Sequence, residues 1–222
     1  VTLMQEFAMH RILAVLGTIA IIAGSILALA QDELKRRLAF STVAQVGYVF
    51  LGLGLANAKG LSGTLVHMFS HAVTKSSLFL AAGAMITATG KHRISEMSGI
   101  GKKMPITMAV FTIASLGLVG MPLFSGFIGK WYLLSGALEA GSSSAVAVII
   151  AGSVLCAAYL FPVIRTAYFD PVSKSAGDWQ DPGAPQRVAL ILLAVGVVIL
   201  GVIPGPFLEL ARRAAAELLV VT

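Results

Sequence analysis

The chain has 222 residues, of which 57% are hydrophobic and only 12% are charged, with a formal net charge of +6. Its mean hydropathy is +0.90, whereas soluble domains carry about 25% charged residues, so a water-soluble globular fold is excluded. Apolar runs recur along the whole length, and we expect a single membrane domain over residues 1–222 with no room for a nucleotide-binding module.

The N-terminal residues carry no recognisable targeting signal. Residues 1–11, VTLMQEFAMHR, lack the charged, apolar and cleavable layout of a signal peptide. The chain has no initiating Met, and we therefore expect it to begin inside a larger domain. The basic residues lie almost wholly in connections between apolar runs, an arrangement that orients membrane spans and does not indicate nucleic acid binding.

Five apolar runs are each long enough to cross a bilayer as a helix. The first contains 19 residues without a charge, and at about 1.5 Å per residue it covers about 30 Å, the thickness of the hydrocarbon core. In chain order the expected spans are 12–30, 40–58, 60–89, 145–169 and 188–208. Cys156 lies in the fourth of these and is expected to be a buried thiol. The connection 170–187, rich in Pro, Gly and Asp, is expected to be a flexible loop without a chemical role.

The segment 104–138 is expected to be a broken helix. It is too long for one straight crossing, and its middle reads GLVGMPLFSGFIGKW, in which Pro122 cannot donate the hydrogen bond of a continuous helix. The segment crosses either once as an interrupted span or twice as a hairpin. A single crossing keeps the basic connections at 35–37, 91–103 and 165–187 on one side, so the positive-inside tendency favours six spans.

Three titratable residues, His67, His71 and Lys75, form a ladder inside the third span. They are spaced four residues apart, which places them along one stripe of a helix. His71 and Lys75 fall about 16 to 22 Å along a helix that starts near Gly60, in the middle third of a bilayer. A charge there costs between about 2.5 and 10 kcal/mol, so such residues indicate a function.

Further polar residues lie on or beside the same stripe. Ser70, Thr74 and Ser77 bring hydroxyl groups that would hold water between the ionisable groups, and a hydrated polar file inside the bundle follows. A lysine or histidine in such a file holds and releases a proton, which makes it a relay element.

Lys130 marks a second hydrated site. It follows directly after the Gly/Pro interruption, and unpaired backbone groups at membrane depth are tolerated only where they are buried in protein or face a water-filled cavity. Broken helices that carry an ionisable residue near the midplane are a recurring feature of ion transporters.

The buried histidines and lysines have other possible roles. The histidines would serve equally as hydrogen-bond donors between helices, and lysines near span ends reach the interface. An i, i+4 histidine pair is also typical of metal sites, but supporting ligands are missing from this sequence, which has no H-E-x-x-H motif and no Asp or Glu in the third span. The sequence also has no G-x-S-x-G motif and no Asp pair within an apolar span, so it does not indicate an intramembrane protease. We expect no metal and no cofactor in this chain.

Three stretches, QDELKRRLAFSTVAQVGYVFLGLG, LVHMFSHAVTKSSLFLAAGAMITATG and MPLFSGFIGKWYLL, resemble one family. They are similar to the antiporter-like membrane subunits of NADH:quinone oxidoreductase (respiratory complex I), multi-subunit Na+/H+ antiporters and energy-converting hydrogenases. The resemblance covers residues 12–208. It implies an all-α polytopic bundle of six spans with one broken helix, corresponding to the second inverted repeat of the family plus a closing helix.

The resemblance also implies residue roles and partners. His67, His71 and Lys75 would correspond to the family's proton pathway, and Lys130 to the residue that gates proton exit, with minor polar roles for Ser70, Thr74, Ser77 and Gln45. The family's first repeat is absent from these residues, so we expect other membrane subunits, including a chain that supplies it. Localisation would be the inner (cytoplasmic) membrane, as a multi-pass protein surrounded by lipid.

The expected function is proton translocation by a subunit, or half-subunit, of a respiratory or ion-pumping complex, with no bond-making chemistry in this chain. The alternative is a structural scaffold that packs a larger complex without conducting. The sequence leaves open whether that complex is a quinone reductase, a hydrogenase or a cation/proton antiporter, and whether sodium is moved.

Overall fold

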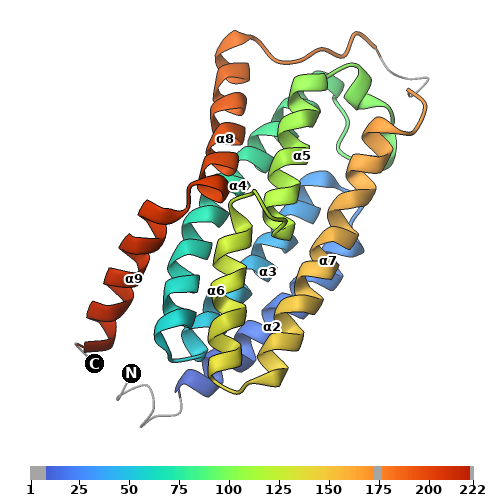
Figure 1. Cartoon of the computed structure of the whole chain (residues 1–222). Helices are drawn as coiled ribbons and strands as arrows, with labels where there is room; N and C mark the ends of the chain where they lie inside the picture. The colour runs from blue at the N-terminus through green and yellow to red at the C-terminus, as the bar shows by residue number, and fades with distance from the viewer. Residues whose placement is uncertain (1–8, 173–176, 221–222) are drawn as a thin grey trace.

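The computed structural model describes residues 9–172 and 177–220, which form an all-helical bundle without strands (Figure 1). The all-α class predicted from the sequence is confirmed. The remaining residues of the expected domain, 1–8, 173–176 and 221–222, lie outside the described part of the chain. The described α-helices are α2 (Met9–Leu29), α3 (Leu34–Gly54), α4 (Ala58–Thr89), α5 (Pro105–Val119), α6 (Gly126–Glu139), α7 (Ser143–Tyr168), α8 (Ala184–Val202) and α9 (Gly205–Val220).

Four of the described helices, α2, α4, α7 and α8, are long and apolar enough to cross a membrane. Helix α3 begins at Leu34 and ends at Gly54, so it is shifted toward the N-terminus from the expected span 40–58. The shift places Arg37 in the first turns of a helix instead of in a connection. Arg37 is buried there, and its guanidinium donates to the carbonyl oxygens of Gln31 at 2.9 Å and Tyr159 at 3.0 Å, which compensates its loss of hydration.

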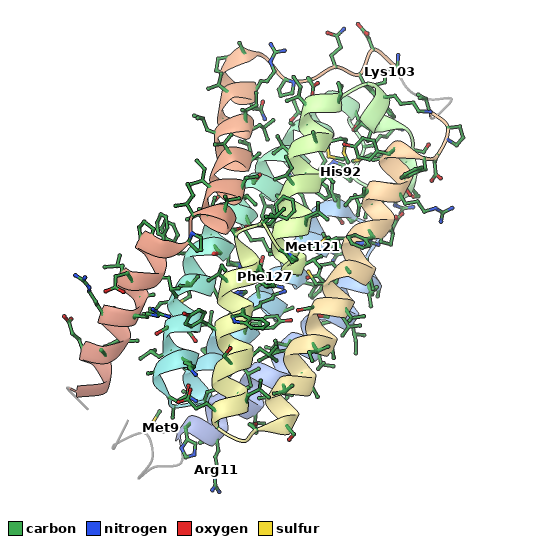
Figure 2. All side chains as sticks on the ribbon, viewed as in Figure 1. Met9, Arg11, His92, Lys103, Met121 and Phe127 are labelled. Atoms are coloured by element: carbon green, nitrogen blue, oxygen red, sulfur yellow. The ribbon has the colours of Figure 1, made fainter. Side chains whose placement is uncertain are left out.

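The segment 104–138 is divided into two helices at the predicted interruption. Helix α5 ends at Val119, and α6 begins at Gly126. Figure 1 shows α5 in the upper half of the bundle and α6 below it, so the two follow one another end to end and do not fold back as a hairpin. Figure 2 places Met121 and Phe127, which flank the interruption, between Lys103 at one end of the molecule and Arg11 at the other.

The expected last span, 188–208, is also divided and does not form one continuous helix. Helix α8 ends at Val202, and a separate helix, α9, starts at Gly205. Pro204 lies between them and has no N–H to continue the first helix, so the chain bends there. In Figure 1, α9 runs away from the end of α8 along the outer flank of the bundle, beside α4.

Small residues bring α2 and α3 into backbone contact. A Cβ added at Gly17 would lie 2.7 Å from the carbonyl oxygen of Gly47, and one added at Gly24 would lie 2.7 Å from the amide nitrogen of Ala44. Helices in membranes associate through close backbone approach of this kind, because lipid tails provide no hydrophobic drive between helices. The packing therefore sets the register of α3 within the bundle.

The contact between α4 and α6 depends on glycines in the same way. A Cβ at Gly129 would lie 2.9 Å from the Cα of His67, and a Cβ at Gly136 would lie 2.6 Å from the amide nitrogen of Gly60. At the same end, Asn57 caps α4 by accepting from the Gly60 N–H at 2.7 Å and donates to the Gly136 carbonyl at 2.8 Å. The α4 ladder is thereby fixed against α6.

The connection between α7 and α8 is partly anchored. Asp181 accepts hydrogen bonds from the N–H groups of Ile106 at 3.1 Å and Thr107 at 2.9 Å, so its carboxylate caps the N-terminus of α5. Trp179 is buried in the core. The expected flexible loop without a role therefore contains, in its described residues, the cap of the broken helix.

We predict that Gly129→Ala destabilises the protein by about 1–3 kcal/mol, because the added methyl group has to displace the backbone of α4 at His67. Thermal unfolding in detergent would show the loss. Gly83→Ala is the matched control within α4, since its Cβ would meet nothing within 4 Å. That control should be neutral or gain up to about 1 kcal/mol from helix propensity. Equal melting temperatures for the two variants would contradict the close α4–α6 packing.

Candidate functional site

A line of buried polar side chains runs through the bundle between α3, α4 and α6. His67 is 2% exposed, and Lys75 and Lys130 are each 6% exposed. His71, on the same helix as Lys75, is partly buried. Gln45 of α3 is buried against the same region. The line therefore contains the two deeply placed lysines and both histidines of the ladder.

The ammonium group of Lys75 is held by α3. Its Nζ donates to the carbonyl oxygen of Leu38 at 2.8 Å and to the hydroxyl of Ser41. The Ser41 hydroxyl donates to the same carbonyl oxygen at 2.8 Å, and Phe79 lies on the other side, with its ring centroid 5.8 Å from Nζ. Lys75 thus has polar partners from the neighbouring helix and does not extend to either end of the bundle.

The ammonium group of Lys130 is held by the interruption itself. Its Nζ donates to the carbonyl oxygens of Leu118 and Val119, each at 2.9 Å. These are the last carbonyls of α5, which have no partner within the helix and carry its partial negative charge. Gly120 follows with a φ of 91°, and a Cβ there would lie 2.8 Å from the Cδ of Lys130, so the turn requires glycine.

Aromatic and imidazole rings lie between the two lysines. The ring centroids of His71 and His67 are 6.2 Å apart, and those of His67 and Tyr48 are 5.3 Å apart. The Nζ of Lys130 lies 4.9 Å from the centroid of the Tyr48 ring, within the range of a cation–π contact. These distances link His71, His67, Tyr48 and Lys130 in turn, and Lys75 lies one turn beyond His71 on α4.

Several polar atoms in this line bond no protein atom within the described residues. They include both ring nitrogens of His67, Nδ1 of His71, both amide atoms of Gln45 and the hydroxyl of Ser77. Buried groups of this kind are normally satisfied, and ordered water is the usual partner where protein groups do not reach. The line is therefore suited to hold water.

The irregular segment between α5 and α6 is fixed by the neighbouring helices. The Ser125 N–H donates to the Val197 carbonyl of α8 at 2.9 Å. The hydroxyl of Ser70 donates to the Ser125 carbonyl at 2.8 Å, and the hydroxyls of Thr74 and Ser125 lie 3.0 Å apart. All of the polar groups of Ser125 are thus paired, although it is fully buried outside regular helix.

Among the residues that the structure describes, no carboxylate forms an ion pair with Lys75 or Lys130. Within the described ranges, the ion pairs are Arg36 with Glu33, Lys59 with Glu139 and Arg213 with Glu209, all between exposed side chains. The same part of the chain has no group of three His, Cys, Asp or Glu side chains arranged to hold a metal ion. Lys75 and Lys130 are both within electrostatic range of His71, so a charge on one group is felt by the others.

The residues predicted from the sequence fall into two groups, one in the buried line and one that bonds the segment between α5 and α6. His67, His71, Lys75 and Lys130 lie in one line, with Ser77 and Gln45 buried near it. Ser70 and Thr74, expected to hold water, instead bond Ser125 and support the interruption.

Two residues of the line were missed or underestimated. Tyr48 was not predicted, because its neighbours lie on other helices. Ser41 lies at the start of the expected second span, where a polar residue predicts only a cap or a packing contact, but it bonds Lys75 directly. The sequence signal for both was the polar sequence AFSTVAQVGY in an apolar span.

Comparison with known proteins gives consistent matches over most of the chain. A family profile described as "NADH:quinone oxidoreductase/Mrp antiporter, TM" matches residues 1–156. The NADH-quinone oxidoreductase subunit N of Desulforudis audaxviator is 43% identical over 204 residues, which cover 85% of this chain and 41% of that protein. The chain thus spans less than half the length of the curated relatives that it matches.

Solved structures agree with the fold. A chain of the Mrp complex from Dietzia sp. DQ12-45-1b superposes with a TM-score of 0.88 and 25% sequence identity, over 96% of this chain and 48% of that one. A chain of respiratory complex I from Thermus thermophilus superposes with a TM-score of 0.83 and 27% identity, over 95% of this chain and 45% of that one.

We predict that Thr74→Val loosens the interruption, because it removes the hydroxyl that bonds Ser125 without changing side-chain size. The expected loss of stability is about 0.6–1.7 kcal/mol, the range measured for hydrogen bonds between membrane helices. Amide hydrogen exchange of residues 120–127 should rise. Thr112→Val is the control, since the Thr112 hydroxyl bonds the Met108 carbonyl of its own helix at 2.8 Å. Unchanged exchange in Thr74→Val would contradict the anchoring role.

Proposed function

Because this chain belongs to the NADH:quinone oxidoreductase/Mrp antiporter transmembrane family, we propose that it translocates protons as a subunit or half-subunit of a larger membrane complex. The observation that carries the proposal is the buried line from Lys75 through His71 and His67 to Lys130, in which both ammonium groups lack a carboxylate partner in the described chain. A positively charged pair at this depth is costly, and its retention indicates use.

The proposed topology has six crossings. Helices α2, α3, α4 and α7 each cross once, α5 and α6 together form one interrupted crossing, and α8 with α9 closes the bundle. The end-to-end arrangement of α5 and α6 supports this count. The bundle corresponds to the second inverted repeat of the family with its closing helix, and its basic connections face the cytoplasm from an inner membrane.

The missing half of the transporter is supplied from outside these residues. The matched relatives are more than twice as long as the aligned part, as their coverage of 41–48% indicates. The first repeat would come from the rest of a longer protein or from a partner chain. Redox energy or an opposing ion gradient would also be provided by other subunits, and no redox chemistry is assigned to this chain.

The line would move a proton by successive protonation and release. A proton held on Lys75 is stabilised by the Leu38 carbonyl and the Ser41 hydroxyl. Its transfer to His71 and then His67 would use Nδ1 of His71 and the buried ring of His67, where water could complete the hydrogen bonding. Like charges repel over these short distances, so a proton arriving at one group favours departure from the next.

Lys130 would complete the transfer at the interruption. In its charged form it is stabilised by the two terminal carbonyls of α5 and by the face of Tyr48. Release of its proton weakens both interactions, which frees the amine from the end of α5. The interrupted helix thereby links the charge of Lys130 to the backbone at the centre of the bundle.

A purely structural role is favoured by one observation. Both ammonium groups bond backbone carbonyls, and lysines that cap helix ends do the same without transporting anything. In this alternative the chain is a scaffold that packs a larger complex. The two roles differ in whether flux depends on the lysines.

We predict that Lys75→Met and Lys130→Met each lower proton flux at least about tenfold, since about 1.4 kcal/mol added to a transfer barrier gives that factor. Flux would be followed with a pH-sensitive dye in liposomes that contain the chain with its co-purifying subunits. Lys103→Met is the control, because Lys103 is exposed at the end of the bundle. Flux that is equal in all four proteins would favour the scaffold.

We also predict that the ring of Tyr48 is needed and its hydroxyl is not. Tyr48→Phe should retain flux, because the face toward Lys130 is kept. Tyr48→Leu should lower flux about two- to thirtyfold, since a buried cation–π contact contributes about 0.5–2 kcal/mol. The same liposome assay distinguishes the variants. Equal loss in both would show that the Tyr48 hydroxyl, which donates to the Ile149 carbonyl at 3.3 Å, is the important group instead.

A further inference from the structure

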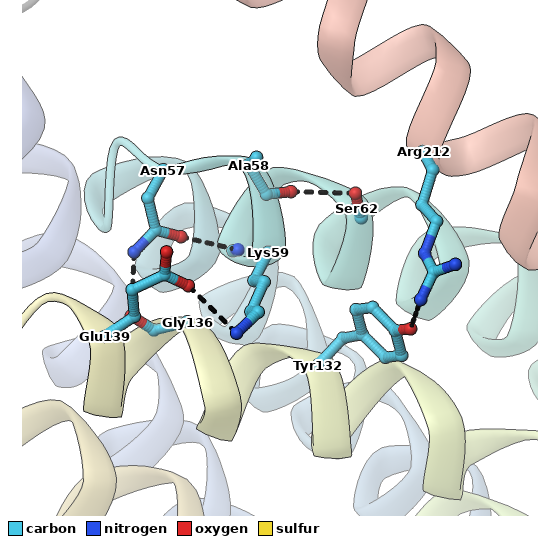
Figure 3. A network of polar contacts seen from close by, with 9 residues as sticks. Asn57, Ala58, Lys59, Ser62, Tyr132, Gly136, Glu139 and Arg212 are labelled. Atoms are coloured by element: carbon cyan, nitrogen blue, oxygen red, sulfur yellow. Dashed lines mark hydrogen bonds and ion pairs between the residues drawn. The ribbon is translucent and has the colours of Figure 1, made fainter.

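A pocket of about 410 Å³ with two basic side chains in its lining lies on the outer flank of the bundle, away from the proton line. It is formed where α9 crosses the start of α4 and the second half of α6. Its polar and aromatic lining consists of Lys59, Ser62, Trp131, Tyr132, Ser135 and Arg212. Figure 3 shows this region, with Arg212 reaching from α9 to Tyr132 of α6, and Lys59 beside Glu139.

The pocket carries an excess of positive charge. Lys59 pairs with Glu139 at 3.3 Å, and both side chains are about half exposed. Arg212 has no carboxylate partner in the described chain, and it donates to the Tyr132 hydroxyl and lies over the same ring at 5.4 Å. Two cations and one carboxylate leave a net charge of +1, and most of the donors of the Arg212 guanidinium remain available.

The neighbouring arginine differs in this respect. Arg213 pairs with Glu209 at 2.8 Å, one turn earlier in α9, and its side chain points to solvent with 75% exposure. The two arginines are adjacent in sequence, but only Arg212 lines the pocket. The position of Arg212 over Tyr132 is therefore a specific feature of the pocket and not a general property of the basic pair.

The surroundings of the pocket are those of a membrane interface. Lys59 lies in the first turn of α4, close to the end of the bundle. Trp131 is 54% exposed at the pocket, and Leu138 and Leu210 nearby on α6 and α9 are 64% and 68% exposed. Tryptophan and tyrosine gather at the level of lipid headgroups. An anion that approaches this pocket is therefore expected to have an apolar part.

We infer that this pocket binds the phosphate group of an anionic glycerophospholipid. Arg212 would bind the phosphate with its free N–H groups, Lys59 would add charge, and Ser135 would offer a hydroxyl at the edge. Guanidinium groups match phosphate oxygens with paired hydrogen bonds, and basic pockets between membrane helices bind anionic headgroups. Trp131 would lie against the glycerol region. The inference does not depend on proton transfer.

The test compares binding of phosphatidylglycerol and phosphatidylcholine to the delipidated chain, purified with its co-purifying subunits, by native mass spectrometry. Phosphatidylglycerol should bind more tightly to the wild type. Arg212→Gln should weaken its binding about fivefold, the effect of one basic residue near an anionic surface. Arg213→Gln is the matched control and should change binding less than about twofold, because its charge is already paired at an exposed site.

A second variant and a competition with inorganic phosphate complete the test. Lys59→Gln also removes the net positive charge and should weaken phosphatidylglycerol binding to the same extent, which provides a second variant if Arg212→Gln does not fold. Inorganic phosphate should not displace the lipid. Displacement by phosphate would overturn the lipid assignment in favour of a free-anion site. Equal binding of the two lipids, or equal effects of the two arginine variants, would overturn the site altogether.

Discussion

The arrangement of this protein depends on satisfying a helix that is interrupted inside an apolar medium. Hydrocarbon offers no hydrogen-bond partners, so every backbone group freed between α5 and α6 has to be paired by protein or water. Lys130 pairs the last carbonyls of α5, Ser70 and Val197 pair the backbone of Ser125, and Asp181 caps the other end of α5. The interruption is possible because α4, α6 and α8 all supply partners to it.

The need to pair the backbone groups between α5 and α6 links the fold to the proposed proton transport. Lys130 donates to the last carbonyls of α5, and a protonated amine would bind them more strongly than a neutral one, so protonation of Lys130 would be coupled to the local backbone. Lys75 is coupled to α3 in the same manner, through the Leu38 carbonyl. A change in charge at either site alters bonds that hold two helices together. The line between them then has a physical means of linking proton position to helix position.

Charged side chains have different partners at the two ends of the molecule and in its centre. At the ends, exposed ion pairs such as Lys59 with Glu139 contribute little individually, because water screens them. In the centre, the two buried lysines have no carboxylate partner within the described residues and are bonded to carbonyl oxygens and a hydroxyl, with an aromatic ring nearby. In the outer pocket, Arg212 is exposed and bonds a neutral partner, the Tyr132 hydroxyl, so its positive charge is not neutralised by an ion pair within the described residues.

The sequence alone determined the membrane class, the ladder on α4 and the interruption near Pro122, because hydropathy, helical spacing and the missing proline N–H are local properties. The position of Tyr48 between His67 and Lys130 was decided by the tertiary structure, since glycine contacts set the register of α3 and α6. Arg37 is buried and donates to the carbonyl oxygen of Tyr159, which lies 122 residues away in the sequence. Contacts between distant segments carry no local signal, so only the packed bundle decides which polar groups meet.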